Sequence, residues 1–181
     1  MGYVIVAVAA AALTIDPSVR AIALDGAVLQ MFSHGLVTGA LFLLVGMIQD
    51  RAHTREMGEF GGLLKTVPLL GWSFVLSAFA SLGLPGLAHF PAELQIFLAT
   101  LGTVPAAVVV ILGIAIIAGT FLKALRETFL GEPRERWHAM PDLSVRELLA
   151  VAPLLVLAVA TGVVPSWVLA IIHRTTSALV L

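Results

Sequence analysis

The sequence predicts an all-α integral membrane protein with five transmembrane spans, of which the third is a discontinuous (broken) helix. Two numbers indicate the class: 60% of the 181 residues are hydrophobic and only 12% are charged, about half the charge of an ordinary soluble domain. Three apolar stretches, at 27–48, 104–122 and 148–172, also approach or exceed the roughly 20 residues that cross a bilayer. We therefore treat residues 1–181 as a single membrane domain.

The composition excludes several kinds of site. Because the chain has no cysteine, it can form no disulfide, thiolate cluster or cysteine-based redox centre. It has no pair of histidines at metal-ligand spacing on one helix, no glycine-rich phosphate loop and no basic patch with interleaved aromatic residues. We therefore expect no cofactor or metal site in this chain and no nucleic-acid partner. Any redox cofactor would lie on another subunit. The lipid bilayer is itself an expected partner of the chain.

The first two spans are expected over residues 2–14 and 19–49. The first is apolar but too short to cross a bilayer alone, which indicates a helix that lacks its beginning. The Asp-Pro-Ser sequence at 16–18 ends it, because proline cannot continue a helix and pushes the preceding residue towards extended geometry. The second span, of roughly 31 residues, would be about 46 Å long, with His34 at its midpoint.

The third span is expected in two pieces, over residues 66–83 and 91–102. The sequence LGLPGLAHFPAELQIF, at 82–97, interrupts the apolar run with two prolines and two glycines. Proline removes a backbone donor and glycine tolerates strained geometry, so these residues end regular helix. The expected hinge of the broken helix consists of Pro85, Gly86 and Pro91. Taken alone, the same motif could equally be a full loop between two spans.

The distribution of positive charge distinguishes a break from a full loop, because the two place all later loops on opposite sides. With a break, one face of the membrane carries Arg51, Arg55, Lys65, Lys123, Arg126, Arg134, Arg136 and Arg146. The other face then carries only Arg20 and Arg174. With a full loop the split would be four to six. Since cytoplasmic loops carry the excess of lysine and arginine, the sequence favours a break, with loops 50–65 and 123–147 in the cytoplasm.

The fourth and fifth spans are expected over residues 104–130 and 144–172. Ser144 and Glu147 have the spacing of a capping box, which favours a helix start at this point. The charged segment between the two spans includes Trp137. This combination is typical of an amphipathic stretch that lies at the membrane surface.

Glu93, His34, His89 and Lys123 are the candidate proton-transfer residues. Ionisable groups at membrane depth cost about 2.5–3.5 kcal/mol even on a lenient insertion scale and are therefore mostly functional. If Pro91 begins the second half-helix, Glu93 lies in its first turn and faces the positive end of the helix dipole. Histidine titrates near neutral pH, so Glu, His and Lys side chains bridged by water would form a proton path.

Each of these side chains also has a purely structural interpretation. The hinge could simply kink a packed helix, with backbone groups capping Glu93. His34 could be a satisfied core histidine, and His89 could face water. Lys123 could extend its side chain to the membrane surface. The residues alone leave these alternatives open.

Two stretches resemble a known family. Residues 30–63, QMFSHGLVTGALFLLVGMIQDRAHTREMGEFGGL, and 81–94, SLGLPGLAHFPAEL, closely resemble the M-subunit (chain 13) family of bacterial NADH-quinone oxidoreductase, or complex I. The resemblance continues more weakly through FLKALRETFLGEP to the end of the chain. Members of this family look like fourteen-helix, antiporter-like proteins built from two inverted repeats, each with one broken helix. This chain would supply helices ten to fourteen, a partial inverted-repeat fold.

The resemblance implies a proton-translocating subunit of the cell inner (plasma) membrane, packed among other antiporter-like membrane subunits. NADH, FMN, iron–sulfur clusters and quinone would be held by other subunits, so this chain would perform no redox catalysis itself. His34 matches the family's mid-membrane histidine. Glu93 matches the acidic residue of the second broken helix, proposed there to lie on the periplasmic path. His89 and Pro91 depart from the residues that the family usually has at the break.

Two other interpretations stand beside this one. The chain could be a subunit of a multisubunit cation/proton antiporter or membrane-bound hydrogenase, or a truncated scaffold that transports nothing. The sequence Arg-Ala-His-Thr-Arg at 51–55, after His-Gly-Leu at 34–36, favours the complex I type over the antiporter. Because the family's proton channel also uses helices that precede this segment, we expect the C-terminal part of a larger subunit, acting as half of a proton-translocating module.

Overall fold

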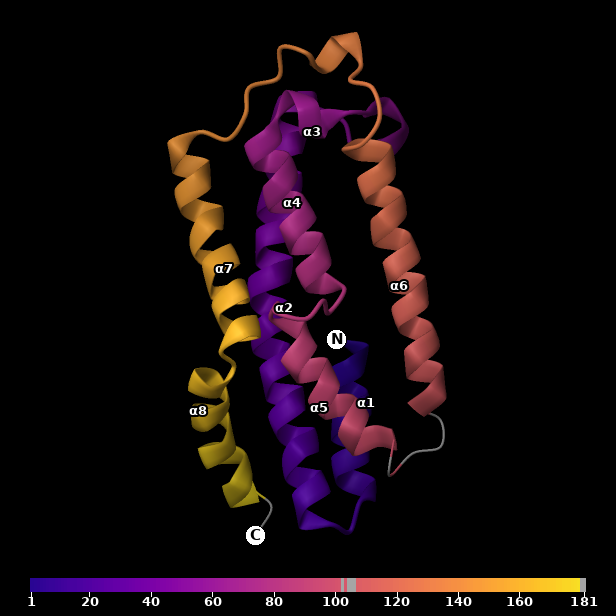
Figure 1. The fold of residues 1–181 in the computed structure, drawn as a ribbon, viewed down its shortest axis with the longest axis vertical. Helices are drawn as coiled ribbons and strands as arrows, with labels where there is room; N and C mark the ends of the chain where they lie inside the picture. Colours follow the sequence, from indigo (N-terminus) through magenta and orange to yellow (C-terminus); the bar gives the residue numbers. More distant parts are fainter. Residues whose placement is uncertain (102, 104–106, 180–181) are drawn as a thin grey trace.

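The computed structural model describes residues 1–101, 103 and 107–179, and every regular element in that part of the chain is a helix (Figure 1). The α-helices are α1 (Gly2–Leu13), α2 (Pro17–Ala52), α3 (Leu63–Thr66), α4 (Pro68–Ser81), α5 (His89–Leu101), α6 (Ala107–Thr128), α7 (Val145–Val163) and α8 (Ser166–Thr176). Short 3-10 helices cover Met57–Glu59, Glu135–Trp137 and Ser177–Leu179. The ends of the spans expected at residues 102 and 104 lie outside the described residues.

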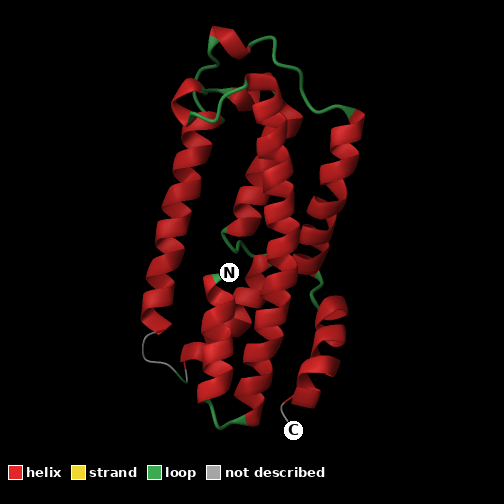
Figure 2. Ribbon diagram, turned by 180° about the vertical axis from the view of Figure 1, so that it is seen from behind, coloured by secondary structure: helices red, strands yellow, loops and turns green. Residues whose placement is uncertain are grey.

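α2 is the central helix and runs the full length of the molecule (Figure 1). It packs against α1, α4, α5, α7 and α8. Its 36 residues correspond to about 54 Å, and among the described helices it and α7 are long and apolar enough to cross a membrane. α4 and α5 follow one another along α2, and so do α7 and α8, whereas α6 stands at the outer side, as the view from behind also shows (Figure 2).

Local sequence sets both ends of α2. The carboxylate of Asp16 caps the start, because it accepts hydrogen bonds from the Ser18 hydroxyl at 2.7 Å and the Ser18 amide at 2.8 Å. The same bonds lower the pKa of the Asp16 carboxyl. Pro17 takes the first helical position, where a missing N–H costs nothing, so the helix begins earlier than residue 19. It ends at His53, which adopts a left-handed φ of 56°.

The segments 53–62 and 129–144 come together at one end of the molecule (Figure 1). Trp137 joins them: it is only 5% exposed, and its indole Nε1 donates a hydrogen bond to the Glu59 carbonyl oxygen at 2.9 Å. Its ring stacks on Phe60 with 5.4 Å between centroids. Trp137 is therefore buried between two loops of the protein, because its polar edge finds a backbone partner there.

The main hydrophobic core lies next to these loops, where α2, α3, α4 and α7 meet. Its innermost members come from every one of those helices and from the end of α6: Leu44, Leu63, Leu70, Phe129 and Val151. Phe129 packs against Phe74 of α4 at a centroid distance of 4.7 Å. This core fixes α4 in position, and α4 leads directly to the break.

The single helix expected over residues 144–172 is divided in the structure. α7 ends at Val163 and α8 begins at Ser166. Pro165 causes the division, because it has no amide hydrogen for the helical ladder and disfavours helical geometry at the residue before it. Val164 accordingly adopts φ −129° and ψ 71°.

α8 is attached to α2 through a buried carboxylate. Asp25 lies with one carboxylate oxygen 2.7 Å from Nδ1 of His173, and its other oxygen accepts a hydrogen bond from the Thr176 hydroxyl. Helices α2, α5 and α8 also share an apolar cluster of Leu29, Ala92, Val168 and Ile172. Together, α7 and the shorter α8 cover α2 over most of its length.

Candidate functional site

Seven residues, 82–88, separate α4 from α5 (Figure 1). α4 ends in a Schellman motif, in which Gly83 has a left-handed φ of 68°. The Gly83 amide donates to the Ala80 carbonyl at 3.4 Å, and the Leu84 amide donates to the Phe79 carbonyl at 3.3 Å. The break therefore begins as an ordinary helix end, with a glycine at the one position that requires positive φ.

The hinge residues expected from the sequence fall on both sides of the start of α5. Pro85 and Gly86 lie in the non-helical segment, and Gly86 has a φ of 88°. α5 already begins at His89, so Pro91 is its third residue. The first four amides of a helix have no intrahelical acceptor, which is why proline is tolerated there. Glu93 is consequently the fifth residue, and our expectation that it lies in the first turn is wrong.

Glu93 is buried beside the break, with only 7% of its surface exposed. It lines a small cavity together with Tyr3 of α1, Ser81 and Leu82 at the end of α4, and Ile114 and Ile117 of α6. Because the helix dipole acts mainly on the first turn, it contributes little at this position. The surroundings of the carboxylate are instead apolar, apart from the Tyr3 and Ser81 side chains and the backbone of the break.

Two histidines stack on one another at the start of α5. His89 lies one helical turn before Glu93 on α5, and its ring is 6.0 Å from the His34 ring of α2, with 15° between the planes. Nδ1 of His89 is 3.3 Å from the Ser81 carbonyl oxygen, which can only accept, so we assign the proton to Nδ1. Nε2 of His89 is buried without a partner in the described part of the chain.

The His34 ring is half-buried and has a polar neighbour on its own helix. The Thr38 hydroxyl lies 3.2 Å from Nδ1 of His34. His34 thus stands between that hydroxyl and the fully buried His89. Our sequence-based interpretation of His89 as a water-facing residue is excluded, because its exposed fraction is 2%.

α2 supplies two further buried polar side chains that we did not single out from the sequence. The Ser33 hydroxyl donates a hydrogen bond to the Ala88 carbonyl of the break at 2.9 Å. Gln30 is also buried, and its Oε1 has no partner among the described residues. Together with His34, these residues recur at spacings of three and four, which puts them on one helix face. This recurrence of polar residues within an apolar helix is the sequence signal that could have identified Ser33 and Gln30.

α7 touches the break at Gly162. A Cβ atom at this position would collide with the backbone of Leu87, at both N and Cα, and with the carbonyl carbon of Gly86. Only a residue without a side chain allows the helix and the loop to come this close. Gly162 therefore determines how closely α7 supports the segment that leads into α5.

Lys123 lies apart from Glu93, His89 and His34. It is exposed on α6, six residues beyond Ile117 of the Glu93 cavity, which corresponds to about 9 Å along the helix axis. The structure stacks His34 of α2 on His89 of α5, and Lys123 belongs neither to this pair nor to the lining of the Glu93 cavity.

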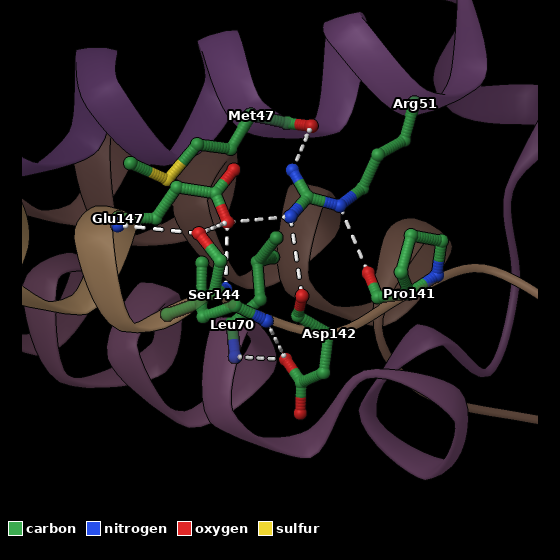
Figure 3. Close-up of polar contacts among 8 residues, drawn as sticks. Met47, Arg51, Leu70, Pro141, Asp142, Ser144 and Glu147 are labelled. Atoms are coloured by element: carbon green, nitrogen blue, oxygen red, sulfur yellow. Dashed lines mark hydrogen bonds and ion pairs between the residues drawn. The ribbon is translucent and has the colours of Figure 1, made fainter.

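A polar network at the loop end fixes the helices that carry the break (Figure 3). The Arg51 guanidinium, at the end of α2, donates to the carbonyl oxygens of Met47 at 2.9 Å, Pro141 at 2.8 Å and Asp142 at 3.2 Å. It also forms an ion pair of 2.7 Å with Glu147 of α7. We call these contacts the Arg51 network. It attaches α2 to the segment that precedes α7.

The same segment caps α4. The Asp142 carboxylate accepts hydrogen bonds from the amides of Leu69 at 2.8 Å and Leu70 at 3.0 Å, the first amides of α4. The capping box expected at Ser144 and Glu147 is confirmed, because each side chain bonds the backbone amide of the other. α4 is thus held at its start by Asp142 and at its end by the Gly83 motif, which positions the break.

The resulting site contains groups that bind and release protons, set in apolar surroundings. Glu93 lines a small cavity, and His89, one turn earlier on α5, stacks on His34 of α2. Side chains of these types carry protons through membrane proteins. Among the described residues, no group of three or more His, Cys, Asp or Glu side chains could hold a metal ion.

Comparison with known families gives one match to a family model. Residues 1–119 match the model described as NADH:quinone oxidoreductase/Mrp antiporter, TM. The NADH-quinone oxidoreductase subunit M of Rickettsia prowazekii (strain Madrid E) is 34% identical over 178 residues, which cover 96% of this chain and 34% of that protein. The subunit M of Rhodobacter capsulatus is 38% identical over 161 residues, which cover 86% of this chain and 31% of that protein.

A solved structure has the same fold. A chain in the structure of respiratory complex I from Thermus thermophilus with bound NADH superposes with a TM-score of 0.88 at 26% sequence identity. The alignment covers 99% of this chain and 36% of that chain. The chain thus spans about a third of the length of the proteins that it matches.

Proposed function

Because this chain belongs to the NADH:quinone oxidoreductase/Mrp antiporter transmembrane family and is a membrane protein, we propose that it conducts protons across the membrane as part of a respiratory NADH-quinone oxidoreductase. The observation that carries the proposal is the carboxylate of Glu93, buried just after a helix break. The helix that carries it begins with His89, whose ring stacks on His34 of α2. Redox chemistry on other subunits, which would hold NADH, FMN, iron–sulfur clusters and quinone, would drive the transfer. Other antiporter-like membrane subunits would be its neighbours.

The proposal includes a membrane topology of five spans. They are α1, α2, the pair α4 and α5 as one discontinuous span, α6, and the pair α7 and α8. The arrangement of the helices supports this, since each pair follows α2 from one end towards the other (Figure 1). Non-helical backbone at membrane depth needs protein or water to satisfy its polar groups, and the Ser33 hydroxyl supplies one such bond to Ala88.

The orientation follows from charge. The end of the molecule that carries segments 53–62 and 129–144 (Figure 1) is also the end with the excess of lysine and arginine. By the positive-inside rule this end faces the cytoplasm. The chain would then cross the inner (plasma) membrane with loops 50–65 and 123–147 on the cytoplasmic side.

Each residue of the site has one role in the proposed path. Glu93 takes up and releases a proton at the break. His89 accepts a proton at the unpartnered Nε2 while Nδ1 donates to the Ser81 carbonyl, so protonation there requires no loss of an existing bond. His34 continues the path on α2 through the stacked ring. Pro85, Gly86 and Pro91 form the hinge of the broken helix. Lys123 has no role in the proposed path.

Replacing Glu93 by Gln tests the proposal. The substitution keeps the shape of the side chain but removes the titrating group, so we expect proton translocation by the assembled enzyme to fall by roughly tenfold or more. Glu132→Gln is a matched control, since Glu132 is an exposed carboxylate paired with Lys65. Proton uptake by inverted membrane vesicles, per substrate oxidised, is the measurement. If the assembled Glu93→Gln enzyme pumps protons at the full rate, the proposal is wrong, and a scaffold that transports nothing remains as the role of this chain.

A further inference from the structure

We infer that Gly83 is a positioning residue for the Glu93 carboxyl group, in addition to ending α4. This inference deepens the proposed function and rests on the proton-transfer role of Glu93. The observation behind it is a contact between two segments of the break. The Glu93 carboxylate lies directly against the Cα of Gly83, on the side where any other residue would carry its Cβ atom.

The space at Gly83 is fully occupied by the carboxylate. A Cβ atom built on Gly83 would collide with Oε2 of Glu93 and would lie 3.0 Å from Cδ and 3.4 Å from Oε1. These are the three nearest atoms outside residues 82–84 in the described part of the chain. Side-chain atoms normally approach no nearer than about 3.5 Å, so the whole carboxyl group stands where a methyl group would be. The carboxyl group takes its present position because residue 83 has no side chain.

The two functions of this glycine are separable. A left-handed φ of 68° favours glycine in a Schellman motif whatever lies nearby. The contact with Glu93 is an independent requirement, because many left-handed positions have open space around them. Gly86, three residues later, is such a position: its φ is 88°, and nothing lies within 4 Å of the Cβ site.

A methyl group at residue 83 would move the carboxyl group without destroying the fold. The clash involves the end of a flexible side chain and no backbone atom, so rotation of Glu93 relieves it. The oxygen must move by more than about 1 Å to reach ordinary contact distance, and misplacement of a reacting group by this amount costs up to about a hundredfold in rate. Proton transfer should therefore suffer more than assembly does.

Gly83→Ala and Gly86→Ala form the matched pair that tests the inference. Both variants force a side chain onto a left-handed residue of the same loop, so both pay a similar strain of about 1–2 kcal/mol. In the assembled enzyme we expect Gly83→Ala to lower proton translocation about ten- to a hundredfold below the level of Gly86→Ala. Equal translocation by the two variants would mean that strain is the only effect, and would overturn the inference.

A double-mutant cycle tests the contact between residues 83 and 93 even if Gly83→Ala lowers the amount of assembled complex. Glu93→Asp shortens the side chain by one methylene group and withdraws the carboxylate from residue 83. The loss of assembled complex caused by Gly83→Ala should then be smaller in the Glu93→Asp background than in the parent. The same loss in both backgrounds would refute a contact between these residues. This coupling is independent of pumping by Glu93→Gln, so the inference and the proposed function fail separately.

Discussion

Gly162 offers the sharpest test of how the break is supported. Replacing it by Ala adds one methyl group that would lie on the backbone of Leu87 and Gly86. Backbone atoms cannot rotate away as a side chain does, so α7 or the loop must shift by more than about 1 Å. Overpacking of this kind costs about 1–3 kcal/mol, or roughly a five- to 150-fold change in an equilibrium constant.

Gly39→Ala is the matched control for this substitution. Gly39 faces α7 from α2, and a Cβ atom there would lie 3.7 Å from Cδ1 of Leu154, an ordinary contact. Both variants gain the same helical preference of alanine over glycine, about 1 kcal/mol. The difference in stability between Gly162→Ala and Gly39→Ala therefore isolates the backbone collision.

Thermal unfolding of the purified complex in detergent measures that difference. For a chain of this size, about 1–3 kcal/mol lowers the midpoint by roughly 2–12 °C. We expect Gly162→Ala to melt lower than Gly39→Ala by an amount in this range, and to lose proton translocation because His89 follows the displaced loop. Identical midpoints for the two variants would refute the close approach of α7 to the break.

Substitutions at three further positions probe the elements around the site. Arg51→Ala removes the ion pair to Glu147 and three bonds to carbonyl oxygens, so it should destabilise the complex by about 2–4 kcal/mol in thermal unfolding. Arg51→Lys should restore only part of this; full restoration would argue against the forked geometry. His34→Ala should reduce proton translocation with assembly retained, and unchanged translocation would make it a core histidine. Ser33→Ala leaves the Ala88 carbonyl unsatisfied, so we expect a loss of about 1–3 kcal/mol by the same thermal assay, and no loss would show that another group satisfies that carbonyl.

The helical class and the approximate extents of most helices could be predicted from local sequence. The Asp-Pro-Ser sequence at 16–18 predicts the end of α1 and the start of α2, because both events depend on residues within one turn. Gly83 and Gly86 predict the interruption before α5 for the same reason. The capping box at Ser144 and Glu147 predicts the start of α7. In each case the determining contacts lie within four residues along the chain.

Local sequence failed where the outcome depends on neighbouring helices. The burial of Trp137 depends on Glu59, far away in the sequence, whose carbonyl oxygen accepts the indole N–H. The role of Gly162 likewise depends on a residue far away in the sequence, because the backbone of Leu87 packs against it. The division at Pro165, by contrast, depends on local sequence, because a proline late in a long apolar run interrupts the helix.

The candidate site was predicted in part. Glu93, His34 and His89 were chosen by type and depth, and the structure brings the two histidine rings together. The closeness of Glu93 to Gly83 depends on how the two ends of the break fold back on one another, which no periodicity encodes. Lys123 satisfied the same criteria of type and position but lies on the exposed side of α6.

The central claim is that the Glu93 carboxyl group changes its protonation as the enzyme turns over. Infrared difference spectroscopy of the assembled enzyme, triggered by addition of the electron donor, measures this directly through the C=O stretching band of a protonated carboxyl group. The account predicts a turnover-dependent band that is absent in Glu93→Gln and present in the control Glu132→Gln. A difference spectrum that is the same in Glu93→Gln and the parent enzyme would contradict it.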